Sequence, residues 1–123
     1  MFVSIDEQDS RPIYQQIVSQ VREQVSQSLL APGDELPSVR ELSDSLGINM
    51  HTVRRAYVEL RDQGIISMRL GRRARITGIR PASAGAVRDD TIEPRLKELV
   101  TDALLSGMTA EEFKAMVDRQ FEK

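Results

Sequence analysis

The side chains best suited to contact another molecule are the polar and basic ones within residues 49–55. On double-stranded DNA, asparagine pairs well with adenine, arginine pairs with guanine, and threonine or methionine can touch the methyl group of thymine. The candidates for contact with base edges are Asn49, Met50, His51, Thr52, Arg54 and Arg55. Some have plainer alternatives, because Asn49 also suits a helix cap and Met50 and His51 also suit an ordinary protein surface.

Positive charge is concentrated in the same part of the chain, although the net charge of all 123 residues is −2. Residues 40–80 carry nine basic and four acidic side chains, and the segments before and after them are acidic. A polyanion responds to such a local field more than to net charge. A solvated basic face is the alternative interpretation. The candidates for contact with phosphates and a narrow minor groove are Arg40, Arg69, Arg72, Arg73 and Arg75.

Other classes of function find little support in the composition. The chain has no cysteine, one histidine and no glycine-rich phosphate loop, and the adjacent acidic pairs Asp89-Asp90 and Glu111-Glu112 point apart. No apolar run approaches the ~18 residues of a membrane span, and the first residues lack a secretory signal. We therefore expect a cytoplasmic protein that is not an enzyme and has no metal, cofactor or membrane segment.

The first element that must position these side chains is a long helix. Apolar residues at i, i+4 spacing predict about five turns starting near Pro12. The members of this stripe are Ile13, Ile17, Val21, Val25 and Leu29. The proline- and glycine-containing segment 31–37 then ends the helix.

Two short helices follow and are joined by a tight turn. Ser38 and Glu41 form a capping box that starts one helix, and Gly47 suits its left-handed end. Asn49 is the expected cap of the next helix, whose apolar positions are Val53, Ala56, Tyr57 and Leu60. This arrangement is a helix-turn-helix. The β-prone runs 65–69 and 73–77 around Leu70-Gly71-Arg72 predict a hairpin, so residues 1–78 are expected to form a winged helix-turn-helix.

The remaining residues predict a linker over 79–90 and a helical tail over 91–123. A helix ends at Gly107, and Thr109 with Glu112 forms a capping box that starts another. A tail this small cannot bury its apolar stripes alone, so we expect it to pair with a second copy. Packing against the chain's own N-terminal domain is the alternative. The predicted dimerisation residues are Leu96, Leu99, Val100, Leu104, Phe113, Met116, Val117 and Phe121.

Residues 12–78 resemble the DNA-binding domain of the GntR family of bacterial transcription regulators. The matching motifs, in chain order, are PIYQQI (12–17), PGDELPSVREL (32–42), LGIN (46–49), TVRRAY (52–57), Leu60, GII (64–66) and GR (71–72). Their order and spacing extend over more than half of the chain. The short tail is similar to that of the smallest branch of the family, called YtrA-type.

The resemblance implies a homodimer that binds a near-palindromic operator. Family contacts map onto Arg40, Arg54, the helix start at residues 49–52 and the wing tip at Gly71. Two positions depart from the family pattern. Met50 stands where relatives often have a basic or polar residue, and the wing sequence at residues 71–76 is more basic than the Gly-Arg-Gly-Thr of many relatives.

The sequence therefore predicts a mainly helical protein with a small β hairpin, in which a winged helix-turn-helix precedes a two-helix dimerisation tail. Its expected function is that of a dimeric, sequence-specific repressor that binds an operator through the helix starting at Asn49 and an arginine-rich wing. The alternative is a winged-helix module for protein–protein contact or non-specific DNA architecture. No residue cluster marks a small-molecule effector. The predicted DNA-binding set is Ser38, Arg40, Asn49, Met50, His51, Thr52, Arg54, Arg55, Gly71, Arg72 and Arg73.

Overall fold

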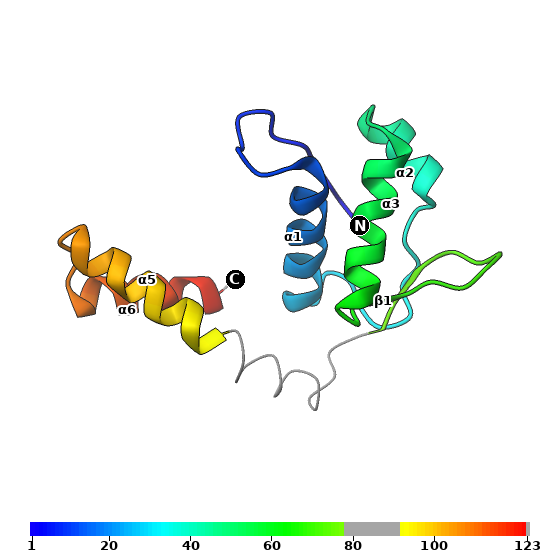
Figure 1. Ribbon diagram of the computed structural model, residues 1–123. Helices are drawn as coiled ribbons and strands as arrows, with labels where there is room; N and C mark the ends of the chain where they lie inside the picture. Colours follow the sequence, from blue (N-terminus) through cyan, green and yellow to red (C-terminus); the bar gives the residue numbers. More distant parts are fainter. Residues whose placement is uncertain (78–91, 123) are drawn as a thin grey trace. The chain divides into compact units, whose positions relative to one another are not determined.

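The structure is a computed structural model that describes residues 1–77 and 92–122. The chain divides into two compact units, Met1–Ile79 and Arg80–Lys123. The first contains helices α1, α2 and α3 and a two-stranded sheet, and the second contains helices α5 and α6 (Figure 1). This confirms the predicted mainly helical chain with a small hairpin. The predicted linker 79–90 lies outside the described residues.

Helix α1 spans Ile13–Ser26 and packs its apolar stripe into the core of the first unit. It is shorter than predicted, because the backbone turns left-handed at Ser28 (φ +60°). The N–H groups of Leu29 and Leu30 both donate to the Gln24 carbonyl, which closes the helix end. The prediction that Leu29 continues the buried stripe is therefore wrong: Leu29 is 68% exposed, and Leu30 is buried instead.

Helices α2 (Val39–Leu46) and α3 (Met50–Asp62) form the predicted helix-turn-helix. The Ser38 hydroxyl accepts the Glu41 N–H, and the Glu41 carboxylate accepts the Ser38 N–H, so the capping box is confirmed. Gly47 ends α2 with φ +67°, a left-handed conformation that favours glycine. These caps fix the short turn between the two helices, and with it the start of α3.

The core of the first unit lies between α1, α3 and the sheet. The side chains of Val53, Ala56, Tyr57 and Leu60 in α3 are buried, as the sequence predicts. Val39 and Leu46 of α2 are only partly buried, whereas Leu42 is fully part of the core. The other buried apolar residues of this cluster are Ile17, Val18, Val21, Leu30, Leu36, Ile66, Ala74 and Ile76.

The wing, residues 65–77, consists of strand β1 (Ile66–Ser67), strand β2 (Arg75–Ile76) and the loop between them. The strands pair antiparallel, with Ile66 opposite Ile76, and both are shorter than the predicted runs. The other edge of β2 bonds to residues 33–36: the Leu36 N–H donates to the Ala74 carbonyl at 2.8 Å. The base of the wing is thus held from two sides, while its arginine-rich loop extends away (Figure 1).

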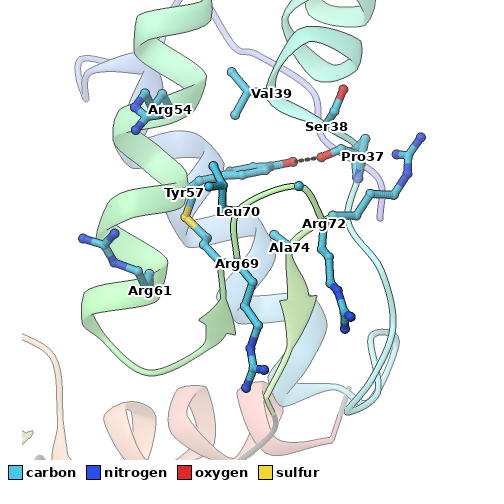
Figure 2. A pocket seen from close by; sticks show the side chains of 13 residues that line it. Pro37, Ser38, Val39, Arg54, Tyr57, Arg61, Arg69, Leu70, Arg72 and Ala74 are labelled. Atoms are coloured by element: carbon cyan, nitrogen blue, oxygen red, sulfur yellow. Dashed lines mark hydrogen bonds between the residues drawn. The ribbon is translucent and has the colours of Figure 1, made fainter.

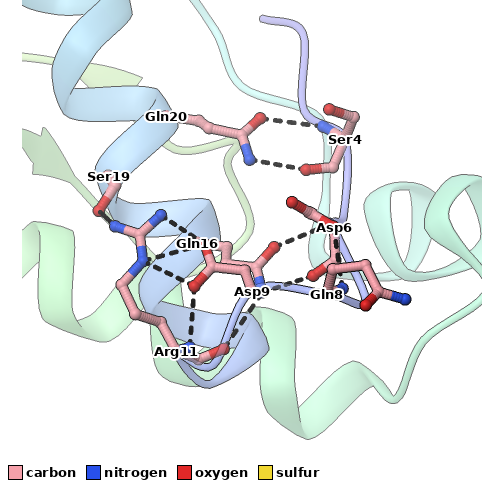
Figure 3. A network of polar contacts seen from close by, with 8 residues as sticks. All are labelled: Ser4, Asp6, Gln8, Asp9, Arg11, Gln16, Ser19 and Gln20. Carbon is pink, nitrogen blue, oxygen red and sulfur yellow. Dashed lines mark hydrogen bonds and ion pairs between the residues drawn. The ribbon is translucent and has the colours of Figure 1, made fainter.

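The N-terminal segment, residues 2–6, lies along α1 through a series of glutamine contacts that the sequence analysis did not predict. Gln16, Gln20 and Gln24 each accept one backbone N–H and donate to the same residue's carbonyl, on Asp6, Ser4 and Phe2 respectively. Figure 3 shows the first two of these pairs, beside the ion pair of Arg11 with Asp9. Side-chain amides one helical turn apart therefore form hydrogen bonds with the backbone N–H and carbonyl groups of alternate residues in an extended segment, as a neighbouring β-strand would.

In the second unit, α5 spans Glu93–Leu105 and α6 spans Ala110–Phe121. The predicted capping box at the start of α6 is confirmed, since Thr109 and Glu112 exchange both hydrogen bonds. Gly107 follows α5 with φ +81°. Across the two described ranges, no helix combines the length and apolarity that crossing a membrane requires.

Candidate DNA-binding surface

Helix α3 presents a buried face and an exposed face, and the predicted base-contacting residues lie on the exposed one. Met50, His51, Arg54 and Arg55 are exposed, and Thr52 is partly exposed. This division follows from the helical period of 3.6 residues, because the core residues recur every three or four positions. A helix of this diameter fits the major groove of B-DNA.

Asn49 caps α3, as the sequence analysis expected. Its Oδ1 atom accepts the N–H of His51 at 2.7 Å, which satisfies one of the free donors of the first turn. The amide NH₂ group of Asn49 is the part that remains as a donor toward a base. Capping therefore does not use the part of Asn49 that the predicted base contact requires.

Several arginines near α3 are held by neighbouring side chains. The Arg55 guanidinium stacks on the Tyr14 ring, with 3.9 Å between its carbon and the ring centroid. Arg61 pairs with Asp62 at 3.2 Å. Arg75 pairs with Glu35 at 3.5 Å. These contacts limit the conformations of the side chains without burying them.

Arg73 in the wing forms an ion pair with Glu41 in the first turn of α2. The Arg73 guanidinium, together with hydrogen bonds from Ser38, lowers the pKa of Glu41 from 4.5 to about 2. The same contact raises the pKa of Arg73. Arg73 stays a predicted DNA contact, but a phosphate must compete with this carboxylate for it.

The side chains of a different group of arginines have no hydrogen-bond or ion-pair partner among the described residues, and all of them are exposed. This group consists of Arg40, Arg54, Arg69 and Arg72. Unpaired surface guanidinium groups are available to phosphates and to guanine, which they bind with two parallel hydrogen bonds. Arg40 comes from α2, whereas Arg54 of α3 and Arg69 and Arg72 of the wing line one groove.

A groove of about 530 Å³ lies between α3, the start of α2 and the wing (Figure 2). Arg54 and Arg61 line it from α3, and Arg69, Arg72 and Arg73 line it from the wing. The groove is open to solvent and carries positive charge on both sides. A phosphate backbone is the kind of ligand that matches it.

Tyr57 lies beneath this groove and is part of the core. Its side chain is 2% exposed, and its hydroxyl donates to the Pro37 carbonyl at 2.7 Å. Burial raises the pKa of Tyr57, so the phenol stays neutral. The prediction of Tyr57 as an apolar position of this helix is confirmed, and its hydroxyl bond connects α3 to the segment that precedes α2.

Three other contacts in this region were missed by the sequence analysis. They are the Glu41–Arg73 pair, the stacking of Arg55 on Tyr14, and the bonds of segment 33–36 to β2. Each joins residues far apart in the chain, so no local pattern could have revealed it. Among the residues that the structure describes, no group of three or more His, Cys, Asp or Glu side chains could hold a metal ion.

The sequence matches the model for bacterial regulatory proteins of the gntR family over residues 13–76. It is also 38% identical over 109 residues to the HTH-type transcriptional repressor YtrA of Bacillus subtilis (strain 168). That match covers 89% of this chain and 84% of the Bacillus protein.

Two solved structures are similar over nearly the whole chain. The transcriptional antiterminator from Listeria monocytogenes EGD-e has a TM-score of 0.84 and 29% identity, covering 100% of this chain and 91% of that one. YtrA from Sulfolobus acidocaldarius, a GntR-family transcription factor, has a TM-score of 0.61 and 35% identity, covering 98% of this chain and 97% of that one.

Proposed function

This chain belongs to the GntR family of bacterial regulatory proteins, and we propose that it is a homodimeric repressor that binds a near-palindromic operator in the cytoplasm. As a member of that family it is a DNA-binding transcription regulator and not an enzyme. Repression is inferred from the similar Bacillus protein, which is named a transcriptional repressor.

The observation that carries the proposal is the basic groove between α3 and the wing. Exposed polar side chains of α3 lie beside Arg54, and Arg69 and Arg72 face the groove from the wing. In helix-turn-helix proteins the second helix enters the major groove with its first residues against base edges. The wing then lies over the flanking backbone, where its arginines add affinity that depends on salt.

The proposed dimer rests on the apolar surface of the second unit. Leu99 is 55% exposed, Leu104 is 69% exposed and Phe121 is 84% exposed, while only Ala103 is buried among residues 92–122. Phe113 is the one predicted dimerisation residue that is partly buried within the unit. Large apolar side chains exposed in this number favour an interface, and a twofold pair is the commonest way to cover one.

A twofold dimer explains why the operator would be near-palindromic. Each copy would present one α3, and half-sites about 34 Å apart, one turn of the duplex, would accept both. The proposal assigns the tail, residues 91–123, to dimerisation and residues 1–78 to DNA, joined by residues 79–90. It assigns no small-molecule effector.

Selection from a random duplex pool tests the proposal directly. We expect enrichment of one near-palindromic sequence and, in sedimentation, a dimer that binds one duplex. In a gel shift, a scrambled duplex should bind far more weakly than the selected one. Equal binding to both duplexes would favour the alternative of a non-specific architectural module, and a pool that yields no bound duplex at all would favour a protein-binding module.

Arg54 gives the sharpest single test of base contact. Arg54→Ala should weaken binding to the selected operator by about 1–3 kcal/mol, because a bidentate arginine contact contributes that much. Arg22→Ala is the matched control, since Arg22 is exposed on α1 and bonds to Gln63 at 3.0 Å. If both variants bind like the unmodified protein, α3 does not contact the bases through Arg54.

A further inference from the structure

Leu70 occupies the tip of the wing and its side chain is fully exposed. The Arg72 N–H donates to the Arg69 carbonyl at 3.1 Å and closes a four-residue turn. Leu70 and Gly71 are the central residues of this turn, and Gly71 has φ +76°. A positive φ at the third position is typical of a type II turn and explains the glycine, but it does not call for leucine before it.

Folding does not account for this leucine either. Leu70 is absent from the core cluster of the first unit, whereas Met68, two residues earlier, packs against that cluster. Turn tips favour proline or short polar residues at this position. The apolar surface of the Leu70 side chain is therefore available for contact with a partner molecule.

The flanking residues indicate the chemistry of that partner. Arg69 and Arg72 are exposed on either side of the turn and have no ion-pair partner among the described residues. A partner must thus offer anionic groups on both sides of an apolar surface. The minor groove of DNA does so, because phosphates line its edges and deoxyribose forms its walls.

We propose that Leu70 enters the minor groove beside each half-site and discriminates against G·C pairs there. In the minor groove an A·T pair presents only acceptors, whereas a G·C pair adds the 2-amino donor of guanine. A leucine against the groove floor would bury that donor without a partner, which costs roughly tenfold or more in affinity. Arg69 and Arg72 would hold the tip in place through phosphates, and Leu70 would add the sequence preference.

This inference rests on the proposed operator binding, and it also requires that Leu70 itself contributes to the preference for A·T pairs. Arginines attracted to a narrow groove also favour A·T-rich DNA, through electrostatic potential. The 2-amino group of guanine also limits how narrow the groove becomes, so both effects respond to a base analogue such as inosine, which has the major-groove face of guanine without that group. Leu70→Ala removes only the direct contact, so comparing this variant with the unmodified protein on the same duplexes separates the two effects.

The experiment uses the operator selected above, with the A·T pairs flanking each half-site replaced in turn by G·C or inosine·C. We expect the unmodified protein to lose about tenfold in affinity on G·C at the wing position and to recover it on inosine·C. Diaminopurine·T, which adds an amino group to an A·T pair, should bind as weakly as G·C. Leu70→Ala should bind all four duplexes within about twofold of one another.

Leu29→Ala is the matched control. Leu29 is 68% exposed on the same unit, and it does not line the protein groove between α3 and the wing. It should keep the full discrimination of the unmodified protein. The inference is overturned if Leu70→Ala discriminates as strongly as the unmodified protein, or if inosine·C binds as weakly as G·C. Failure to select any operator would instead contradict the proposed function.

Discussion

Glu41 and Arg73 join the first turn of α2 to the wing through an ion pair, although they are 32 residues apart in the chain. The same Oε1 atom of Glu41 accepts the Ser38 N–H and completes the capping box. The position of the wing is therefore coupled to the start of the helix-turn-helix. A regulator that binds through both elements needs them in a fixed relation, because misplacing one weakens the contacts of the other.

The Glu41–Arg73 pair should respond to acid in a defined direction. Because the pKa of Glu41 is lowered from 4.5 to about 2 in the folded protein, its stabilising effect is complete above about pH 4.5 and is lost as the pH falls toward 2. We expect the Glu41 carboxyl to titrate near 2 when followed by NMR. In Arg73→Ala the midpoint should rise toward 4.5. An unchanged midpoint would show that Arg73 does not contact Glu41 in solution.

Glu41→Gln provides the control that separates the ion pair from the cap. Glutamine also suits the third position of a capping box, so the hydrogen bond to Ser38 is kept while the charge is removed. We expect amide hydrogen exchange to become faster in the wing and to stay unchanged in α2. Faster exchange in both elements would mean that the cap had been lost as well.

Gln16 should contribute measurably to stability, although it is a polar residue in the core. It is 3% exposed, accepts the Asp6 N–H at 2.9 Å, and donates to the carbonyls of Asp6 and Arg11. Gln16→Ala leaves these groups without their partner and should lower the free energy of unfolding by about 1–3 kcal/mol in urea titrations. Gln15→Ala, on the exposed side of α1, should change it by less than about 0.5 kcal/mol. Equal effects would contradict the role of the glutamine contacts.

Arg72 should act on DNA through charge. Its side chain is exposed at the wing loop and has no ion-pair partner in the described part of the chain. Arg72→Ala should weaken operator binding and make the dependence of log affinity on log salt shallower by about one, the effect of one phosphate contact. Arg22→Ala should leave that slope unchanged. A slope identical to that of the unmodified protein would remove Arg72 from the phosphate contacts.

Leu99 should be required for the proposed dimer. It is 55% exposed within the apolar stripe of α5, and Leu99→Glu would place a charge in the interface. Sedimentation should then show monomers at micromolar concentration, with loss of high-affinity operator binding. Thr101→Glu adds the same charge away from the stripe and should remain dimeric. A dimer that survives Leu99→Glu would exclude this face of α5 from the interface.

The helix-turn-helix was predictable from sequence because its determinants are local. The Ser38–Glu41 capping box, Gly47 and Asn49 act within one helical turn, and the buried positions of α3 recur with the helical period. The exposed face of α3 follows from the same period. The sequence therefore determined the helices and the candidate base-contacting residues of α3.

Contacts between distant residues were decided by the tertiary structure alone. Nothing near Arg73 in sequence distinguishes it from Arg72, yet the Arg73 side chain pairs with Glu41 and the Arg72 side chain has no ion-pair partner in the described residues. Leu29 fits the apolar period of α1, but the chain turns at Ser28 and Leu30 takes the buried place. Local periodicity specifies which face of a helix is apolar. The pairing of charged side chains and the exact end of a helix depend on the free energy of the whole folded structure.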